Sequence, residues 1–549
     1  MRFLSDPSLP GHGIVTGVFF KRDGSIVAVA SSFHWLTNPP ARASYDGQHL
    51  RHRVALYRPP DVKPFAVFDS LRFPVNDVAF HPFEQTVAIA TGSYDGGFLF
   101  EGQLVVWDWK KGPYSDRIGP IPEVVRTAFS NDGAHIVSFV RPWNEDLENE
   151  AFDSFNAFYE VRATYSEELF EGIFNEDSIK IQIDRQAPKT AEDVARDPRF
   201  RPLEADSEAA LQRAFSLSEI KSRSAIWDVA WLDNNDIAIV HNDCQLEIMS
   251  PEGITNQRFE GETYGAQILK GHSLFVHAAR FNPQAQDWDT AYSAHLLRYN
   301  GADVTEVANF AGAFTFSVSR DGWILGRRSR SPSAKAERLD VIGSPTLETW
   351  ARHNVGHYDV FNHFLRIDGA PDLFAVQGTP PSSHEYKQVC VVSHDGSVKP
   401  LWPIVSDTGS GSHHAMECAF GYVADSVGEG IIASGKYFNP GPRLPYDGFI
   451  IRKRLHDGKG LWRHATKAGA TTIKAIPGTE VILAAFLNGE FAAIDSTSGE
   501  ILQWTDFRPD GSASVIFSFD VTARDILIGT IDGRVGIIAV NDFLKSGFS

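Results

Sequence analysis

Five histidines occur within about sixty residues of one another in the second half of the chain, at His353, His357, His363, His413 and His414. Imidazole nitrogens bind divalent metals, and two histidines four residues apart share one face of a helix. The sequence around the first three, ARHNVGHYDVFNH, instead leads into a strand, and the chain has no His-Glu-x-x-His motif.

A metal site would therefore need histidines that converge from separate parts of the fold. The alternative is that these are solvated loop residues. We keep His353, His357, His413 and His414 as candidate metal ligands and otherwise predict no metal or cofactor.

The segment GEGIIASGKY, residues 428–437, resembles two phosphate-binding motifs. Gly430, Gly435 and Lys436 match the start of a phosphate loop, but Tyr437 stands where a Ser or Thr would hold magnesium. Both motifs act only as a turn that leads into a helix N-terminus. Because the apolar residues here are typical of a strand, we predict a strand and its turn. No Gly-x-Ser-x-Gly motif or local Ser/His/Asp pattern occurs, so we assign no catalytic residue.

A basic cluster lies in the segment RRSRSPSAKAER. Its members are Arg327, Arg328, Arg330, Lys335 and Arg338. We predict a polar loop that contacts phosphates or an acidic partner, or else a solvated loop without a partner. No aromatic residues are interleaved, so stacking on single-stranded nucleic acid is not indicated.

The composition excludes several classes of protein. Lys plus Arg is 51 and Asp plus Glu is 69 among 549 residues, a formal charge of −18, which makes general nucleic-acid binding unlikely. Three cysteines without Cys-x-x-Cys spacing make neither a disulfide framework nor a thiolate zinc module. The start has no apolar signal segment, and no window is apolar enough to span a membrane. We expect a cytoplasmic protein that does not bind membranes.

Short β segments separated by tight turns dominate the sequence. The dipeptide Asp-Gly occurs eleven times and is typical of two-residue hairpins, in which glycine takes a positive φ. Apolar or alternating runs such as VNDVAF, TVAIATG and IWDVAW lie between the turns. The usual order is strand, turn, strand, turn, strand.

The strands recur with the period of a propeller blade. Candidate first strands begin near residues 15, 75, 124, 226, 266, 314, 362, 414, 471 and 515, and most spacings fit a four-stranded blade. We therefore predict an all-β propeller of about ten antiparallel blades, as one large ring or two smaller ones, unless some of these blades are misassigned. Residues 2–4 are placed to pair with the last blade and close a ring.

Three segments follow from this organisation. Residues 1–141 and 223–549 are predicted blades, and residues 142–222 are an acidic, partly helical insertion. Within it, Thr190 and Asp193 have the spacing of a capping box, and Leu203, Ala210, Ala214 and Leu217 lie near one face of a possible helix. The insertion is either a distinguishing contact surface or a decorating loop.

The repeats resemble two propeller families. VNDVAFHP followed by VAIATG and GQLVVWDW resembles a WD40 repeat, with Trp107-Asp108 in the place of the Trp-Asp pair. FAAIDSTSGEILQW, residues 491–504, resembles the repeat of pyrroloquinoline-quinone-type propellers, and DGKGLW and DGSVKPLW echo it. The second resemblance implies a quinone cofactor, but that cofactor accompanies export and no signal segment is visible, so we expect none.

A propeller presents variable loops on a rigid frame, which favours recognition. We therefore predict a non-enzymatic scaffold for protein–protein interaction, as a subunit of a larger complex, whose partner the sequence does not name. Trp35, Trp143 and Trp288 are anchor candidates in addition to the basic cluster. The alternative is a hydrolase or lactonase-like enzyme with a metal in the central channel.

Overall fold

The structure is a computed structural model in which part of the chain can be described. The described residues are 1–4, 13–33, 50, 52–94, 100–115, 121–141, 157–165, 176–217, 225–232, 235–241, 245–251, 253–258, 263–270, 274–282, 284, 292–299, 304–312, 314–328, 340–355, 366–367, 369–377, 388–403, 415–437, 448–511 and 513–548.

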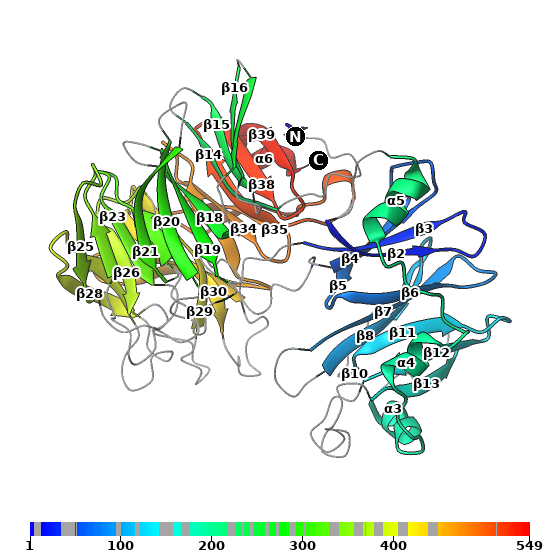
Figure 1. Ribbon diagram of the computed structural model, residues 1–549. Coiled ribbons are helices and arrows are strands. Elements are labelled where there is room, and N and C mark those ends of the chain that lie inside the picture. The colour runs from blue at the N-terminus through cyan, green and yellow to red at the C-terminus, as the bar shows by residue number, and fades with distance from the viewer. Residues whose placement is uncertain are drawn as a thin grey trace. The chain divides into compact units, whose positions relative to one another are not determined.

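The chain divides into two compact units, and it passes from the first into the second and back. Unit 1 comprises Met1–Asp6, His34–Gly47 and Ser224–Ser549, and unit 2 comprises Pro7–Phe33 and Gln48–Arg223. Both are built from antiparallel sheets, so the prediction of an all-β protein with many four-stranded sheets is confirmed (Figure 1).

Unit 2 contains three sheets in its described residues. The first has the order β2-β3-β4-β5, with strands Ile14–Phe20, Val27–Ser32, His52–Tyr57 and Ala66–Leu71. The second has the order β10-β8-β7-β6, with β9 beside β8, and its strands are β6 Val75–Phe80, β7 Thr86–Tyr94, β8 Phe100–Asp108, β9 Gly112–Ser115 and β10 Ile121–Pro122. The third has the order β11-β12-β13, with strands Val124–Phe129, His135–Val140 and Tyr159–Thr164.

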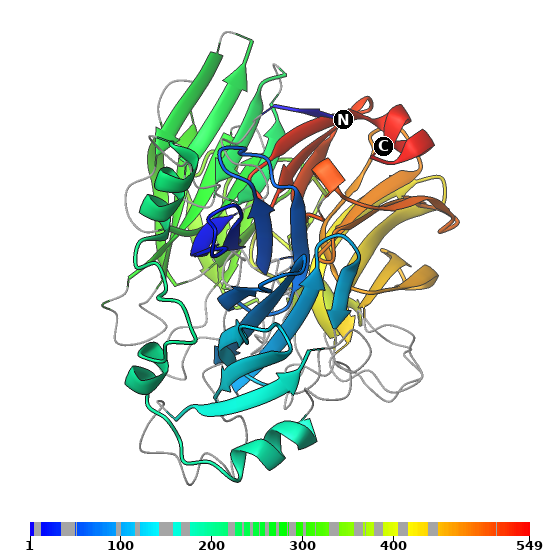
Figure 2. The same cartoon turned by 90° about the vertical axis from the view of Figure 1, so that its right-hand side faces the viewer.

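Three helices pack on these sheets (Figure 2). They are α3 Glu176–Ile183, α4 Ala191–Ala195 and α5 Ser207–Phe215. Helix α4 begins with the predicted capping box, since Thr190 and Asp193 cap each other's backbone amides. Helix α5 buries Ala210, Leu211 and Phe215. The predicted helical face is thus right at Ala210, whereas Leu203 lies outside the helix and is exposed.

Unit 1 contains seven sheets in its described residues, each formed by strands in chain order. The first three are β14 Ile226–Trp231, β15 Ile237–His241, β16 Gln245–Ser250 and β17 Gly253–Arg258; β18 Thr263–Lys270, β19 Leu274–Phe281, β20 Tyr292–Tyr299 and β21 Val304–Ala311; and β22 Phe314–Val318, β23 Ile324–Arg328, β24 Asp340–Gly343 and β25 Trp350–His353.

The next three sheets are β26 Leu373–Gln377, β27 Gln388–Val392 and β28 Val398–Pro403; β29 Ala415–Asp425, β30 Gly428–Tyr437, β31 Gly448–Arg454 and β32 Gly460–Thr466; and β33 Ala470–Ala475, β34 Val481–Phe486, β35 Glu490–Asp495 and β36 Ile501–Asp506. The last sheet has β37 Ile516–Val521, β38 Asp525–Thr530 and β39 Val535–Ala539. The 3-10 turn η1 Pro509–Gly511 precedes β37, and helix α6 Val540–Ser546 follows β39.

The last sheet of unit 1 takes its fourth strand from the start of the chain. Strand β1, Arg2–Phe3, pairs antiparallel with β39, so that Phe3 lies opposite Gly536. The pairing continues at Leu4, whose amide donates to the carbonyl of Val535 at 2.8 Å. The predicted pairing of residues 2–4 with the last sheet is therefore present.

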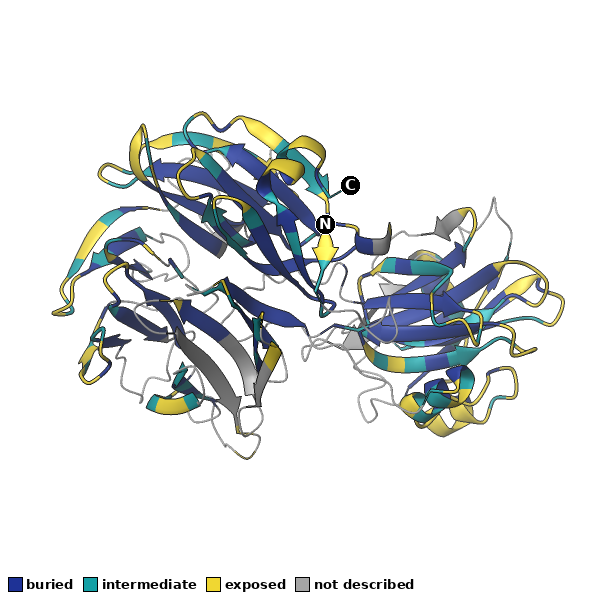
Figure 3. Cartoon of the chain, turned by 90° about the horizontal axis from the view of Figure 1, so that it is seen from above, coloured by how far each residue is buried: buried dark blue, intermediate teal, exposed yellow. Residues whose placement is uncertain are grey.

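Neighbouring sheets of unit 1 pack against each other, and the packing returns from the last sheet to the first. Strand β14 contacts β18, β18 contacts β22, β22 contacts β26, β29 contacts β33, and β33 contacts β37. Phe374 of β26 and Phe420 of β29 share one buried cluster. Strands β37 and β38 then contact β14, and the carboxylate of Asp520 accepts a hydrogen bond from the amide of Trp231 at 2.8 Å. Buried strand centres and exposed turns alternate through both units (Figure 3).

The predicted first strands agree with the sheets. Nine of the ten expected positions begin a described sheet, and the position near 362 lies outside the described residues. The Asp-Gly turns differ from the expected two-residue hairpins. In the turn from Ser130 to His135, the amide of Gly133 donates to the carbonyl of Ser130, and Asp132 accepts from the amide of Ala134. The aspartate carboxylate thus stabilises a longer turn that ends on a glycine with positive φ.

Tryptophans connect successive sheets in the second half of unit 1. The indole of Trp402 donates to the carbonyl of Leu455 at 3.0 Å, and that of Trp462 donates to the carbonyl of Ser496 at 2.8 Å. A Cβ atom at Gly458 or Gly499 would meet these rings at 2.3 and 2.5 Å, so both contacts need glycine. The tryptophans in DGSVKPLW and DGKGLW therefore each pack on the third-to-fourth-strand turn of the next sheet.

Candidate functional site

A groove of about 1130 Å³ lies in unit 2. It is lined by the ends of β2, β6 and β11, which are the first strands of the three sheets, and by residues 198–204 between α4 and α5. Because the last segment has no regular structure, its position depends on side-chain contacts.

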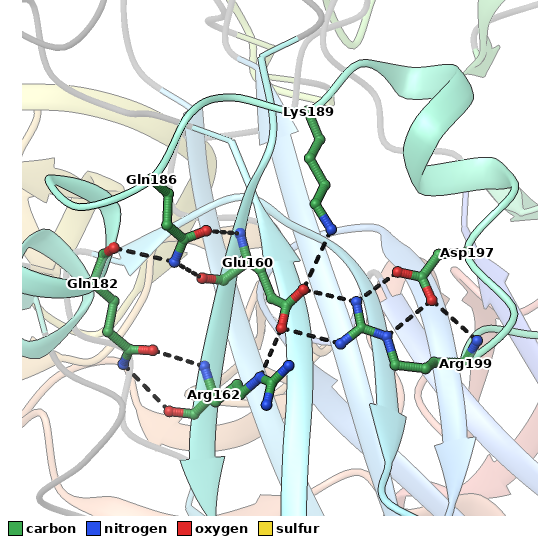
Figure 4. A network of polar contacts seen from close by, with 7 residues as sticks. All are labelled: Glu160, Arg162, Gln182, Gln186, Lys189, Asp197 and Arg199. Carbon is green, nitrogen blue, oxygen red and sulfur yellow. Dashed lines mark hydrogen bonds and ion pairs between the residues drawn. The ribbon is translucent and has the colours of Figure 1, made fainter.

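A polar network holds this segment against β13 (Figure 4). The guanidinium of Arg199 donates to both carboxylate oxygens of Glu160, at 3.0 and 2.7 Å, and also to Asp197. Arg162 and Lys189 contact Glu160 as well. Hydrogen bonding from Arg199 lowers the pKa of Glu160 to about 2 and that of Asp197 to about 2. The network is therefore fully charged at neutral pH and holds one wall of the groove in place.

Helix α3 covers the outer edge of β13 in the same view (Figure 4). Gln186 accepts from the amide of Glu160 at 3.1 Å and donates to its carbonyl at 2.6 Å. Gln182 does the same for Arg162, at 2.9 and 3.3 Å. Gln182 lies in α3 and Gln186 in the turn that follows it, and their side chains meet alternate residues of β13, which are roughly 6.6 Å apart. The two amides take the place of a fourth strand.

A second set of contacts holds the same segment from beneath. Arg126 of β11 donates to the carbonyl of Arg201, and Arg201 donates to the carbonyl of Phe20. Arg126 also pairs with Asp77 of β6 at 2.8 Å, and Asp77 accepts from the amide of Thr127. Burial raises the pKa of Asp77 despite this pairing. The carboxylate thus connects two first strands as well as anchoring the wall.

Two large apolar side chains lie in the groove and are open to solvent. Phe83, in the turn after β6, is 76% exposed, and Leu203, in the wall segment, is 50% exposed. Single exposed hydrophobic residues of this size need no explanation, whereas two that line one groove are a starting point for a proposal about binding.

A second cavity, of about 520 Å³, lies in unit 1. The first strands β14, β18, β22, β29, β33 and β37 all contribute to its lining, as does Arg366 before β26. Every one of the seven sheets therefore reaches this cavity through its first strand or the residues just before it.

Two ion pairs cross between sheets in this cavity. Arg366 pairs with Asp228 of β14 at 2.7 Å, and Asp228 also accepts from the amide of Ile268 at 2.9 Å and the hydroxyl of Ser518 at 2.5 Å. Lys474 of β33 pairs with Asp520 of β37 at 2.9 Å. These contacts join first strands that are far apart in the sequence.

Most residues singled out from the sequence lie outside the described part of the chain. These are Trp35, Trp143, Trp288, Arg330, Lys335, Arg338, His357, His363, His413 and His414. Arg328 ends β23, and nothing is described of its side chain. His353 ends β25. Arg327 is not in a loop: it is buried in β23, with its guanidinium 3.7 Å from the carboxylate of Asp340.

The segment Gly428–Tyr437 forms strand β30, as the sequence predicted, and pairs along its length with β29 and β31. Gly430, Gly435 and Lys436 lie within this strand and pair with its neighbours, so their amides are not the free N-terminal amides of a helix that a phosphate loop needs.

Sequence reasoning missed the residues that build both sites. Asp77 and Asp228 occupy the same place in VNDVAF and IWDVAW, and this shared aspartate was the available signal. The cations of the unit 1 cavity come from four separate sheets, so no spacing within one short segment of the sequence could predict them.

No model of a known protein family matches the sequence, and a search of curated proteins finds no significant match. Within the described ranges, no group of three or more His, Cys, Asp or Glu side chains is arranged to hold a metal ion. Among the helices that the structure describes, none has the length and apolar character needed to cross a membrane.

Proposed function

We propose that the chain is a non-enzymatic scaffold that binds a protein partner through the groove of unit 2. The observation that carries this proposal is the pair Phe83 and Leu203, which are exposed in a groove whose wall is braced by buried and charged contacts. Aromatic and aliphatic anchors on a rigid support are typical of interaction hot spots.

The groove favours a partner segment with an apolar side chain flanked by carboxylates. Its described lining has four cationic residues, Lys21, Arg22, Arg199 and Arg201, and three acidic ones, Asp23, Asp77 and Glu204. Asp77 is neutralised by Arg126, and Arg199 is neutralised by Glu160 and Asp197. This leaves Lys21, Arg22 and Arg201 against Asp23 and Glu204, so the surface is more positive than the chain as a whole. Such a surface attracts acidic segments.

The proposed frame for this scaffold includes a seven-bladed propeller formed by unit 1. Supporting it are the sheet-to-sheet packing, which returns from β37 to β14, and β1, which supplies the fourth strand of the last sheet. The resemblance to WD40 and quinone-type repeats fits this proposal. A cytoplasmic location within a larger complex remains part of it.

The test compares partners recovered from the native source with wild-type chain, Phe83→Asp, Leu203→Asp and a control, Ile254→Asp. Ile254 is 57% exposed in β17 of unit 1, so it matches the groove residues in exposure and chemistry but lies in the other unit. We expect one partner whose recovery, quantified by mass spectrometry, falls about tenfold or more in both groove variants, the loss of one interaction hot spot.

The same partner should bind the Ile254→Asp variant as it binds the wild type. If each partner responds equally to all three substitutions, the groove is not the binding surface. Turnover of a small molecule by the purified chain would contradict the scaffold itself.

A further inference from the structure

The cavity of unit 1 carries more positive than negative side chains. Among its described lining residues, Lys270, Arg320, Arg366 and Lys474 are cationic, and Asp228 and Asp520 are acidic. Four cations against two carboxylates leave an excess of two positive charges, in a chain whose formal charge is −18.

Each carboxylate already has its own cation. Asp228 pairs with Arg366 at 2.7 Å, and Asp520 pairs with Lys474 at 2.9 Å. The excess is therefore contributed by Lys270 and Arg320, which come from two other sheets.

These two cations lie at matching places in the fold. Lys270 is the last residue of β18, and Arg320 follows the end of β22 by two residues. Both are exposed, so they lie where the cavity opens to solvent.

The field of Lys270 reaches across to β37. Burial by itself would raise the pKa of Asp520, but Lys474, a hydrogen bond from the amide of Trp231 and the charge of Lys270 together hold it below its usual value. Lys270 thus acts on the cavity and not only on bulk solvent.

The cavity has room for a small molecule at this end. Its volume of about 520 Å³ falls within the range of small-ligand sites. Gly369 and Gly478 belong to the lining, and a Cβ atom added to either would meet nothing within 4 Å.

We propose that the unit 1 cavity is a binding site for a small dianion, held by Lys270 and Arg320 above the two internal ion pairs. The shared chemistry is two negative charges on a compact oxygen-rich group, as in a phosphate monoester or a short dicarboxylate. The planar guanidinium of Arg320 can donate two parallel hydrogen bonds to either group, and Lys270 supplies a compact charge. Clustered cations in a hollow concentrate such anions.

The test uses the full chain with inorganic phosphate, succinate and acetate as probes, each compared with chloride at equal ionic strength. Isothermal titration measures affinity, and thermal unfolding measures stability. We expect phosphate, succinate or both to bind, with acetate weaker because it carries one charge. Lys270→Gln and Arg320→Gln should each weaken binding about tenfold, the loss of one charge-assisted contact.

The control is Lys399→Gln, which removes an exposed lysine from β28 outside the cavity lining. This variant should bind like the wild type. Both side chains are exposed, so the two cavity variants should lose little thermal stability without ligand, whereas a large loss would mean that these side chains hold the fold rather than a ligand.

Three results would overturn the proposal: no binding of either dianion, equal protection by acetate, or equal weakening by Lys399→Gln. Phosphate alone or succinate alone as the ligand would support it and identify the group. The outcome is independent of the scaffold proposal, because the groove and the cavity lie in different units.

Discussion

Two three-stranded segments of this chain, one in each unit, are completed in different ways. In unit 1, strands β37, β38 and β39 gain a fourth strand from β1, which precedes all of unit 2 in the sequence. In unit 2, strands β11, β12 and β13 gain the side-chain amides of Gln182 in α3 and of Gln186 in the turn after it. An open edge exposes unpaired backbone groups, and both solutions satisfy them.

The difference teaches what each solution adds. A backbone strand from a distant part of the chain ties two ends of the sequence together, since β1 from the start of the chain pairs with β39 near its end. The glutamines are close in sequence, only about twenty residues after β13. They hold α3 and the turn after it against the edge of β13, where another strand would otherwise extend the sheet.

The same contrast holds for one aspartate in a shared strand pattern. Asp77 in β6 and Asp228 in β14 each accept a hydrogen bond from the first strand of the following sheet. Asp77 pairs with Arg126 of β11, in the following sheet. Asp228 instead pairs with Arg366, which precedes β26 in the third sheet after its own. Arg366 and Asp228 can pair although their sheets are not consecutive, because both side chains line the same cavity.

The largest expected effect comes from these aspartates. Asp77→Ala removes the partner of the buried Arg126, and Asp228→Ala that of the half-buried Arg366; the first costs about 3–5 kcal/mol of the free energy of unfolding and the second somewhat less. Hydrogen exchange read by mass spectrometry should show faster exchange in β11 for the first variant, and in β18 and around residue 366 for the second. Equal effects of both variants on both units would contradict the assignment of these contacts to separate units.

Removal of residues 1–4 should cause a smaller loss in the free energy of unfolding. The last sheet then loses its backbone pairing with β1, worth about 2–3 kcal/mol for the three paired residues. Exchange at β39 should increase, as should the concentration dependence of light scattering, because the exposed edge can pair with other chains. Unchanged exchange in β39 would show that β1 does not protect it.

The glutamine substitutions should have a still smaller effect. Gln182→Ala with Gln186→Ala removes the cover from the β13 edge and costs about 1–2 kcal/mol, since water can replace part of the lost hydrogen bonding. Exchange of the Glu160 and Arg162 amides should rise. Ile181→Ala on the same helix changes an exposed side chain and is the control; an equal rise there would mean that α3 as a whole, not its glutamines, protects the strand.

The substitution Arg199→Gln should have the smallest effect on stability at neutral pH, and its main effect should be on the acid dependence of stability. The pKa of Glu160 is lowered from 4.5 to about 2 in the folded chain, so its stabilising contribution is present above 4.5 and is lost as the pH falls toward 2. Carboxyl titration by NMR should show this low value in wild type and a higher value in Arg199→Gln. Denaturation of unit 2 at several pH values should show a flatter acid dependence in that variant.

An exposed ion pair provides the control for this titration. Arg213 and Glu204 pair at 3.1 Å with both side chains largely exposed, so Arg213→Gln should change stability by less than about 0.5 kcal/mol. A Glu160 pKa that is the same in wild type and Arg199→Gln would contradict the network.

Much of the strand pattern could be predicted from sequence because it depends on local signals. Alternating apolar runs and Asp-Gly turns placed nine first strands, and the Thr190–Asp193 spacing gave a helix start. The turn type was wrong because the aspartate side chain accepts backbone hydrogen bonds and lengthens the loop.

The sites could not be predicted, because their residues meet only after folding. Lys270, Arg320 and Lys474 are each ordinary strand-end residues in the sequence. Gln182 and Gln186 gain their role only when α3 and the turn after it pack along β13. The division into two units was also hidden, since blade-like repeats occur in both and two short early segments, residues 1–6 and 34–47, join the later one.

The most direct test of the account is a disulfide between β1 and β39, since the proposed propeller of unit 1 depends on that pairing. In a background lacking Cys244, Cys390 and Cys418, Phe3→Cys with Gly536→Cys places two thiols directly opposite each other. The account predicts nearly complete oxidation, seen as the mass loss of two hydrogens and as a more compact denatured chain on gels. Phe3→Cys with Ala539→Cys is out of register and should oxidise poorly. Equal oxidation of both pairs, or none in the first, would contradict the pairing of β1 with β39 on which the proposed propeller depends.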